Sequence, residues 1–270
     1  MNDETENNSA SADPGDLYSH TCQLARSTNG NDIAALYRRL SDASFLEQLD
    51  STDAYDGPAV HLRVAGVMQT LAENSTIQAE ALLLYLTQSS VYLAERARVE
   101  LLIQALVKIR PAPAEAVAFW EKHFQPEDGY TPITVWALLN NGSEPAIALF
   151  ERKMLDVNFP ETEREYWLKA EVLQHRNDLS LLQACNRLLE SSLEEQYRLL
   201  LIDVIFDYQP DDWYGARYRY KPPPREHASK EAIDELRALG YKSLQTQPLI
   251  KHQQKMVKQV LRDIDEGNRS

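Results

Sequence analysis

ERARVELLIQALVKI, the stretch of residues 95–109, is the segment that decides the fold. Its apolar side chains recur at steps of three, four and three residues, which is the spacing of one face of a helix. These side chains are Val99, Leu102, Leu106 and Ile109. Prolines follow at once and end the helix, because proline lacks the amide hydrogen that would continue it. A second amphipathic stretch over residues 114–124 then predicts a partner helix.

Similar amphipathic stretches recur along the chain at intervals of 36, 36, 31 and 31 residues. They begin near Ala59, Glu95, Thr131, Thr162 and Leu193. Each of the first four is followed, after a polar or proline break, by a second stretch of the same kind. Two helices in every 30 to 40 residues or so are typical of an α-solenoid. The sequence therefore predicts an all-α fold, a right-handed solenoid of antiparallel helix pairs.

The predicted helices can be placed from their apolar faces and their breaks. The expected pairs cover residues 17–27 with 32–49, 59–72 with 77–93, 95–109 with 114–124, 133–139 with 145–155, and 163–173 with 179–189. Gly142 suits the position after a helix end. A last member spans residues 193–208, after which Pro222, Pro223 and Pro224 force an extended segment. Two further helices are expected at the C-terminus: residues 229–239, stopped by Gly240, and a helix that starts near Pro248.

Two of the repeats suggest a family. LRVA at residues 62–65 and ARVELL at residues 97–102 resemble the first-helix pattern of bacterial HEAT-like repeats, in which an arginine precedes small and aliphatic residues. The resemblance covers residues 59–209. The later repeats have Trp136 and Trp167 in place of the arginine, and their spacing approaches that of tetratricopeptide repeats. The resemblance implies a scaffold protein, although a few bacterial HEAT-like proteins are bilin lyases.

The charge is distributed unevenly along the chain. The net charge of −13 argues against general affinity for nucleic acid. Residues 1–212 carry 16 basic and 34 acidic side chains, whereas residues 213–270 carry 12 and 7. Such a shift in charge is typical of a boundary. We therefore expect an acidic disordered tail over residues 1–15, a repeat domain over residues 16–212, and a basic C-terminal cap over residues 213–270.

Cysteine content and hydropathy bear on the compartment. Cys22 and Cys185 are far apart in sequence and are expected to be free thiols. No apolar run reaches the roughly 20 residues that span a bilayer, so no membrane insertion is expected. Residues 1–15 contain no lysine or arginine and do not resemble a signal peptide. These features favour a cytoplasmic protein. The alternative is a periplasmic or envelope-associated protein whose signal or anchor has been removed.

The motifs of common enzyme classes are missing from the sequence. The six histidines show no zinc-helix spacing, and there is no glycine-rich phosphate loop or G-x-S-x-G elbow. The sequence thus predicts no catalytic residues and no cofactor. One acidic group could bind a divalent cation, because three carboxylates at steps of four would share one helix face. This weak candidate consists of Asp203, Asp207 and Asp211, and a solvated acidic face is the simpler interpretation.

The most unusual segment is WYGARYRYK at residues 213–221. In an extended chain its tyrosines would point to one side and its basic residues to the other. We interpret it as a cap on the terminal repeat, or as an aromatic and basic recognition strip for an acidic peptide, a phosphate group or a glycan. The candidate partner-binding residues are Trp213, Tyr214, Arg217, Tyr218, Arg219, Tyr220 and Lys221.

The sequence as a whole favours a non-enzymatic scaffold that binds a protein or peptide. The surplus of carboxylates over residues 1–212 predicts a partner with a basic surface there. Two alternatives stay open. One is an accessory module of a bacterial envelope assembly, and the other is a bilin lyase-like protein of the HEAT type.

Overall fold

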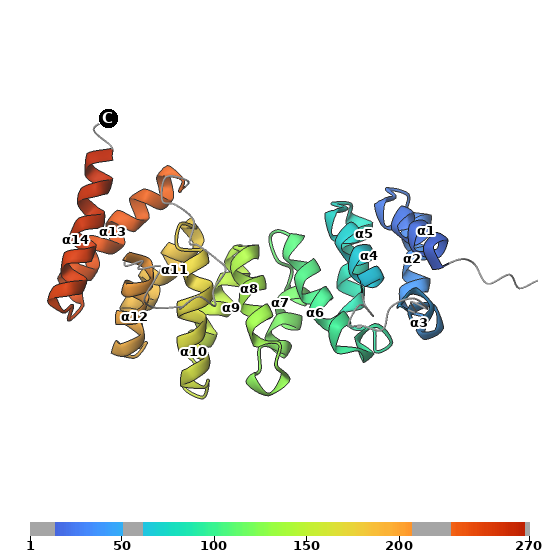
Figure 1. Cartoon of the computed structure of the whole chain (residues 1–270), viewed down its shortest axis with the longest axis horizontal. Coiled ribbons are helices and arrows are strands. Elements are labelled where there is room, and N and C mark those ends of the chain that lie inside the picture. Colours follow the sequence, from blue (N-terminus) through green and yellow to red (C-terminus); the bar gives the residue numbers. More distant parts are fainter. Residues whose placement is uncertain (1–13, 51–61, 207–227, 268–270) are drawn as a thin grey trace, which may run out of the picture. The chain divides into compact units, whose positions relative to one another are not determined.

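The computed structural model describes residues 14–50, 62–206 and 228–267. All regular structure in these residues is helical, which confirms the all-α prediction (Figure 1). The chain forms two compact units, Met1–Ile109 and Arg110–Ser270. The predicted boundary between residues 212 and 213 lies outside the described residues.

The first unit contains six α-helices among its described residues. They are α1 (Pro14–Arg26), α2 (Gly30–Leu40), α3 (Ala43–Asp50), α4 (Leu62–Glu73), α5 (Ile77–Leu86) and α6 (Arg96–Ala105). Two short 3-10 turns, η1 (Tyr92–Ala94) and η2 (Leu106–Lys108), flank α6. Helix α4 packs against both α1 and α6, while α2 packs against α5. Leu36, Leu71 and Leu102 are fully buried between these helices.

Two predictions for this unit are wrong at helix ends. The expected helix over residues 32–49 is two helices, because the Asp42 side chain accepts hydrogen bonds from the amides of Ser44 and Phe45 and starts a new helix. The expected helix over residues 77–93 ends at Leu86, and a turn and η1 follow. The first break depends on these contacts of Asp42, and at the second Ser89 Oγ accepts a hydrogen bond of 3.2 Å from the amide of Tyr92 in η1; an apolar pattern contains neither contact.

The second unit contains eight α-helices among its described residues. They are α7 (Ala114–His123), α8 (Thr131–Asn141), α9 (Glu144–Met154), α10 (Glu161–Trp167), α11 (Leu179–Glu190), α12 (Glu195–Phe206), α13 (Lys230–Thr246) and α14 (Lys251–Gly267). A 3-10 turn, η3 (Pro126–Asp128), precedes α8, and a π-helical turn, η4 (Leu168–Val172), continues α10.

The helices of the second unit pack in two rows. In the first row α7 contacts α9, α9 contacts α11, and α11 contacts α13. In the second row α8 contacts η4, η4 contacts α12, and α12 contacts α14. Sequence neighbours such as α8 and α9, or α13 and α14, join the rows. Each helix therefore packs against the helix two places along the chain, which Figure 1 shows for α11 and α13.

The turn between α8 and α9 confirms the prediction for Gly142. Its φ of 65° lies in the left-handed region, which glycine adopts without strain. Ser143 occupies the N-cap position of α9, but its hydroxyl oxygen instead accepts a hydrogen bond of 3.1 Å from the amide of Ala112. The turn thus also fixes the segment that leads into α7.

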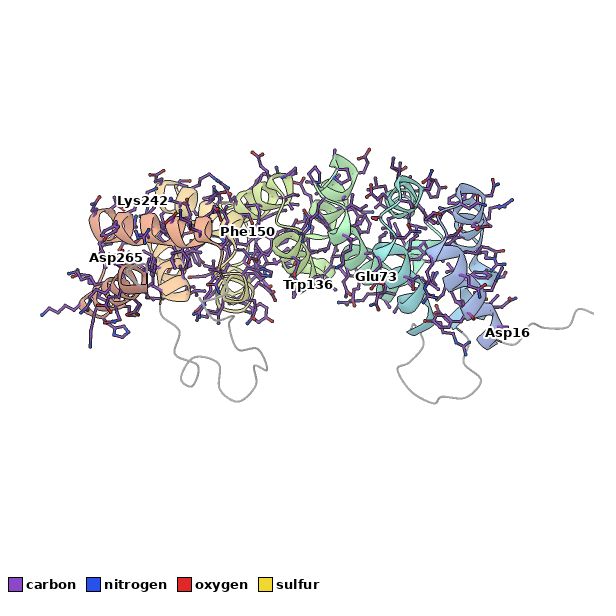
Figure 2. The ribbon with its side chains drawn as sticks, turned by 90° about the horizontal axis from the view of Figure 1, so that it is seen from above. Asp16, Glu73, Trp136, Phe150, Lys242 and Asp265 are labelled. Atoms are coloured by element: carbon purple, nitrogen blue, oxygen red, sulfur yellow. The ribbon has the colours of Figure 1, made fainter. Side chains whose placement is uncertain are left out.

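Aromatic side chains fill the centre of the second unit. The ring centroids of Phe124 and Trp167 are 4.9 Å apart, and those of Phe159 and Trp167 are 4.4 Å apart. Trp167 and Phe150 are fully buried, whereas Trp136 is 37% exposed at the edge of the ribbon (Figure 2). The two tryptophans that distinguish the later repeats therefore have different environments.

The prediction for Gly240 is wrong. Helix α13 continues through this glycine to Thr246 instead of stopping at Leu239. A Cβ atom at Gly240 would lie 3.0 Å from Leu261 Cδ2 on α14 and 3.3 Å from Phe206 Cε1 on α12. The glycine thus allows three helices to approach closely, and it does not act as a helix stop.

Both cysteines are free, in agreement with the sequence prediction, and both are buried. Burial raises the pKa of the Cys185 thiol to about 12. A thiol with such a high pKa is protonated at neutral pH and is a poor nucleophile. No helix in the part of the chain described here has the length and apolar character needed to cross a membrane.

Candidate functional site

Most of the residues predicted as a site fall outside the described residues. This holds for the whole recognition strip, Trp213, Tyr214, Arg217, Tyr218, Arg219, Tyr220 and Lys221, and for Asp207 and Asp211. Asp203 lies on α12, where its Oδ1 accepts a hydrogen bond of 2.8 Å from Gln253 Nε2 on α14. That carboxylate therefore helps to join two helices. Across residues 14–50, 62–206 and 228–267, no group of three His, Cys, Asp or Glu side chains is arranged to hold a metal ion.

The described part of the second unit has a charged cavity of about 620 Å³ along α7, α9 and the residues after α9. Five of its seven lining residues are charged, and Ala148 and Leu155 complete the lining. The charged residues are Glu121, Glu151, Arg152, Lys153 and Asp156. We call this feature the α7–α9 cavity.

Ion pairs between neighbouring helices of the first row hold the walls of this cavity. Arg152 Nη2 on α9 lies 2.9 Å from Glu121 Oε2 on α7. Glu151, the preceding residue, accepts hydrogen bonds from the guanidinium of Arg187 on α11. Two of the three acidic groups and one of the two basic groups of the lining are therefore paired.

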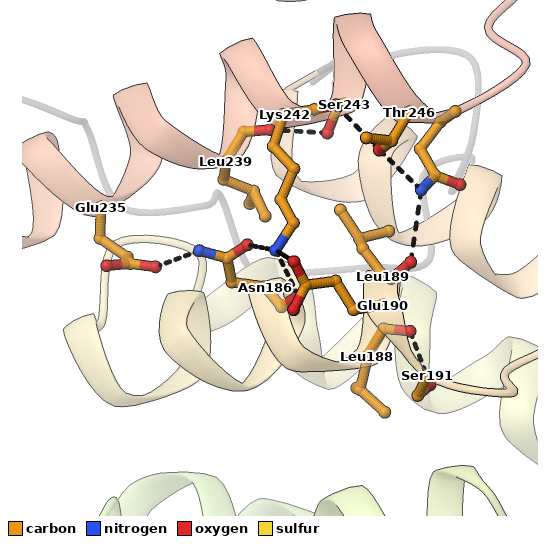
Figure 3. A network of polar contacts seen from close by, with 11 residues as sticks. Asn186, Leu188, Leu189, Glu190, Ser191, Glu235, Leu239, Lys242, Ser243 and Thr246 are labelled. Atoms are coloured by element: carbon orange, nitrogen blue, oxygen red, sulfur yellow. Dashed lines mark hydrogen bonds and ion pairs between the residues drawn. The ribbon is translucent and has the colours of Figure 1, made fainter.

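The same kind of contact continues to the end of the row (Figure 3). Asn186 Nδ2 on α11 donates to Glu235 Oε1 on α13 at 2.7 Å, and Lys242 Nζ donates to Asn186 Oδ1 at 2.6 Å. Lys242 also pairs with Glu190. The row from α7 to α13 thus has a polar contact at every step between successive helices, in addition to its apolar core.

Lys153 is the unusual member of the cavity lining. It follows Leu149 by one helical turn and occupies an inward position, where the pattern of α9 calls for an apolar residue. The residue is only 8% exposed. Its Nζ lies 5.6 Å from the centroid of the Phe124 ring, a cation–π distance. Within the described part of the chain, no carboxylate lies within ion-pair distance of this ammonium group.

Most of the Lys153 side chain is buried, and its ammonium group has no anionic partner among the described residues. The contact with the ring of Phe124 stabilises this charge by about 0.5–2 kcal/mol and leaves its N–H groups free to donate. Lys153 can therefore donate hydrogen bonds to an oxygen atom that enters the cavity. This potential donor makes the α7–α9 cavity the best candidate for a binding site.

Arg164 fixes the segment after α9 that forms one edge of the cavity. It is 3% exposed and donates to the carbonyl oxygens of Asp156 and Phe159, the second at 3.0 Å. Its guanidinium also lies 5.0 Å from the centroid of the Tyr197 ring and 3.5 Å from Glu194 Oε1. These contacts hold Asp156 in place, so the cavity has a fixed wall.

A second cluster of polar side chains, the His175 group, lies beside the π-helical turn η4 and consists of Asn140, Glu171, His175 and Asp178. His175 Nδ1 lies 2.7 Å from Asp178 Oδ2, and its Nε2 lies 3.3 Å from Asn140 Nδ2 on α8. Because the amide of Asn140 donates to Nε2, the proton of the neutral ring is assigned to Nδ1, which donates to Asp178. Burial raises the pKa of the nearby Glu171, and the charge of His175 offsets part of this effect.

A carboxyl group with a raised pKa beside a His–Asp pair can serve acid–base chemistry. Here, however, both ring nitrogens of His175 have partners: Asp178 lies in the same turn before α11, and Asn140 joins this turn to α8. This arrangement explains the group as a structural link between helices.

Neither the α7–α9 cavity nor the His175 group was predicted from the sequence. Each combines residues from helices that are about 30 positions apart, and no local motif marks them. A weak signal did exist for Lys153, a charged residue at an apolar position of α9. Comparison with protein-family models, curated proteins and solved structures found no significant match to this chain.

Proposed function

We propose that this chain is a non-enzymatic scaffold of the helical-repeat type that binds a protein or peptide through its second unit. The observation that supports the proposal is the contact of each helix with the helix two places along the chain, in both rows of this unit. Repeat proteins are built in this way, because each repeat packs only against its neighbours and leaves a long surface for a partner. The proposed fold is a right-handed solenoid of antiparallel pairs, as in HEAT-like repeats.

The α7–α9 cavity is the proposed contact point on this scaffold. Lys153 would donate to a carboxylate or a main-chain carbonyl oxygen of the partner, and the paired Glu121 and Arg152 would border it. Residues 110–212 of the second unit carry 9 basic and 19 acidic side chains, and this surplus of carboxylates would attract basic groups of the same partner. A partner that offers one oxygen acceptor within a basic surface fits both features.

Affinity capture with the immobilised full chain tests this proposal. Lys153→Met removes the charge and keeps a flexible side chain of similar length against Phe124. We expect the wild type to retain a partner from its own cells in a fixed ratio, and Lys153→Met to retain about tenfold less, the loss expected for one charge-assisted hydrogen bond. Lys230→Met, at an exposed lysine at the start of α13, is the matched control and should behave as the wild type.

Two results would contradict the proposal. One is that no polypeptide is retained in a fixed ratio at any ionic strength. The other is that Lys153→Met and Lys230→Met capture as much of the partner as the wild type does. A purified sample that takes up a tetrapyrrole and becomes coloured would instead support the bilin-binding alternative.

A further inference from the structure

Helix α14 has a stripe of four basic side chains on its solvent-exposed face. Lys251, Lys255, Lys258 and Arg262 follow one another at steps of four, three and four residues. This spacing places them on one side of the helix, and all four are exposed. The opposite side packs inward through Gln253, Val257 and Leu261. We call the four residues the α14 stripe.

Among residues 14–50, 62–206 and 228–267, no acidic side chain forms an ion pair with the α14 stripe. None of its four members forms an ion pair with another residue in the part of the chain that the structure describes. Two acidic residues follow Arg262 on the same side: Asp265 is already paired with Arg237 on α13 at 3.1 Å, and Glu266 is exposed and forms no ion pair with the stripe within the described residues. Arg262 Nε donates to the carbonyl oxygen of Lys258 at 3.3 Å, which keeps its guanidinium along the stripe.

The stripe is opposed by the electrostatics of the helix itself. Positive charges are unfavourable near a helix N-terminus and favourable near its C-terminus. Helix α14 has the reverse arrangement: no acidic residue stands in its first turn and no basic residue in its last. Like charges at steps of three and four also repel one another. Helix stability therefore does not account for the α14 stripe, whereas a bound acidic partner would.

We propose that the α14 stripe binds an acidic segment of a partner protein. This inference rests on the proposed scaffold function and adds a second contact point to it. From Lys251 to Arg262 the stripe is about 16 Å long, at 1.5 Å per residue. That length matches three turns of an acidic helix or about five residues of an extended acidic peptide.

A short acidic segment fits better than an extended polyanion. Residues 110–212 of the same unit carry 9 basic and 19 acidic side chains, and this surplus of carboxylates would repel nucleic acid or an anionic membrane that extends beyond α14. A short segment can stay within the stripe and avoid that repulsion. Flexible carboxylates also suit lysine, whose ammonium group demands no planar geometry.

Fluorescence anisotropy with the full chain and a fluorescein-labelled peptide of about 11 glutamates, the length of three helical turns, tests the proposal. We expect saturable binding that weakens as salt rises, because exposed charges are screened. Lys255→Glu with Lys258→Glu should weaken binding by tenfold or more, because two attractive charges become repulsive. The matched control is Lys108→Glu with Lys230→Glu, which changes the net charge equally at two exposed lysines outside the stripe. It should change binding by no more than about twofold.

The proposal is wrong if the peptide does not bind saturably, or if both double variants weaken binding equally. It is also wrong if labelled duplex DNA or vesicles with phosphatidylserine bind through the stripe and the peptide does not. A melting temperature of the Lys255→Glu, Lys258→Glu variant at or above that of the wild type shows that it is folded. If the peptide does not bind to the stripe but Lys153→Met still loses the captured partner, the α14 proposal is wrong and the proposed scaffold function remains supported.

Discussion

Glu151 on α9 accepts two hydrogen bonds of 3.1 Å from Arg187 Nε on α11, one to each carboxylate oxygen, and a further one from Nη2. The Glu151 side chain is 17% exposed, although Arg187 is more open to solvent. The carboxylate of Glu151 raises the pKa of the Arg187 guanidinium. A multiple contact of this kind has both direction and charge, so it fixes how α11 lies on α9.

We expect Glu151→Gln to lower the free energy of unfolding by about 1 kcal/mol, because it leaves the guanidinium without a charged partner. The next residue offers a matched control. Arg152 pairs with Glu121 on α7, but both side chains of that pair are about half exposed. Arg152→Gln should therefore cost less than about 0.5 kcal/mol. Urea denaturation of both variants at low and high salt measures the difference. An equal cost for the two variants would contradict this ranking.

For alanine at Gly240 we predict an effect on stability that is opposite to the one expected from helix propensity alone. Alanine is favoured over glycine inside a helix by about 1 kcal/mol. At this position, however, the new methyl group would meet Leu261 Cδ2 at 3.0 Å and Phe206 Cε1 at 3.3 Å. Both neighbours belong to the packed core, where an added methyl group costs about 1–3 kcal/mol. We expect Gly240→Ala to destabilise the chain by about 1 kcal/mol in urea denaturation.

The control for this prediction is Gly30→Ala in the first turn of α2. There the nearest atom to an added Cβ is Gln78 Cγ at 3.8 Å, an ordinary contact. Gly30→Ala should be neutral or slightly stabilising. A stabilising effect of Gly240→Ala would show that α12, α13 and α14 are not tightly packed at this point.

Gly240 also illustrates what the sequence can predict. The apolar spacing of helices such as α7, α9 and α11 identified them nearly to the residue, because one buried face determines them. The spacing did not reveal that α13 passes through a glycine, since that depends on Leu261 and Phe206 from other helices. Nor did it reveal the π-helical turn at Leu168–Val172.

The candidate site was predictable to a smaller extent. The cavity depends on α7 and α9 lying next to each other, and only Lys153 stood out in the sequence. The predicted recognition strip from Trp213 to Lys221 lies outside the described residues and stays a prediction. The basic character of the C-terminal region was predicted, but its arrangement as one stripe on α14 needed the helix and its buried face.

His123 is expected to make stability depend on pH. It is 8% exposed, its ring packs against the rings of Phe119 and Tyr130, and neither ring nitrogen has a hydrogen-bond partner. Burial lowers the pKa of His123, Lys122 lowers it further, and Asp128 partly offsets both effects. In the unfolded chain this pKa returns to about 6.5.

The sign follows from these two pKa values. Above about pH 6.5 the ring is neutral in both states and stability does not depend on it. Below that pH the unfolded chain takes up a proton that the folded chain does not, so stability falls until the pH reaches the lower, folded pKa. His123→Leu should remove this contribution. The drop in unfolding free energy between pH 7.5 and pH 5.5 should then be smaller than in the wild type.

Replacing a basic residue of the α14 stripe by glutamate is expected to change the stability of the chain in opposite directions at the two ends of the helix. Lys251→Glu places an acidic residue in the first turn and four residues before Lys255, and both changes are favourable. We expect it to stabilise the chain by about 0.5–1 kcal/mol. Arg262→Glu changes the charge by the same amount, but it places a third acidic side chain beside Asp265 and Glu266 near the negative end of the helix. It should destabilise the chain by a similar amount.

Both variants should nevertheless weaken binding of the glutamate peptide. Urea denaturation and anisotropy on the same samples can therefore separate helix stability from recognition: weaker binding in Arg262→Glu alone would mean that the stripe matters only through the stability of α14.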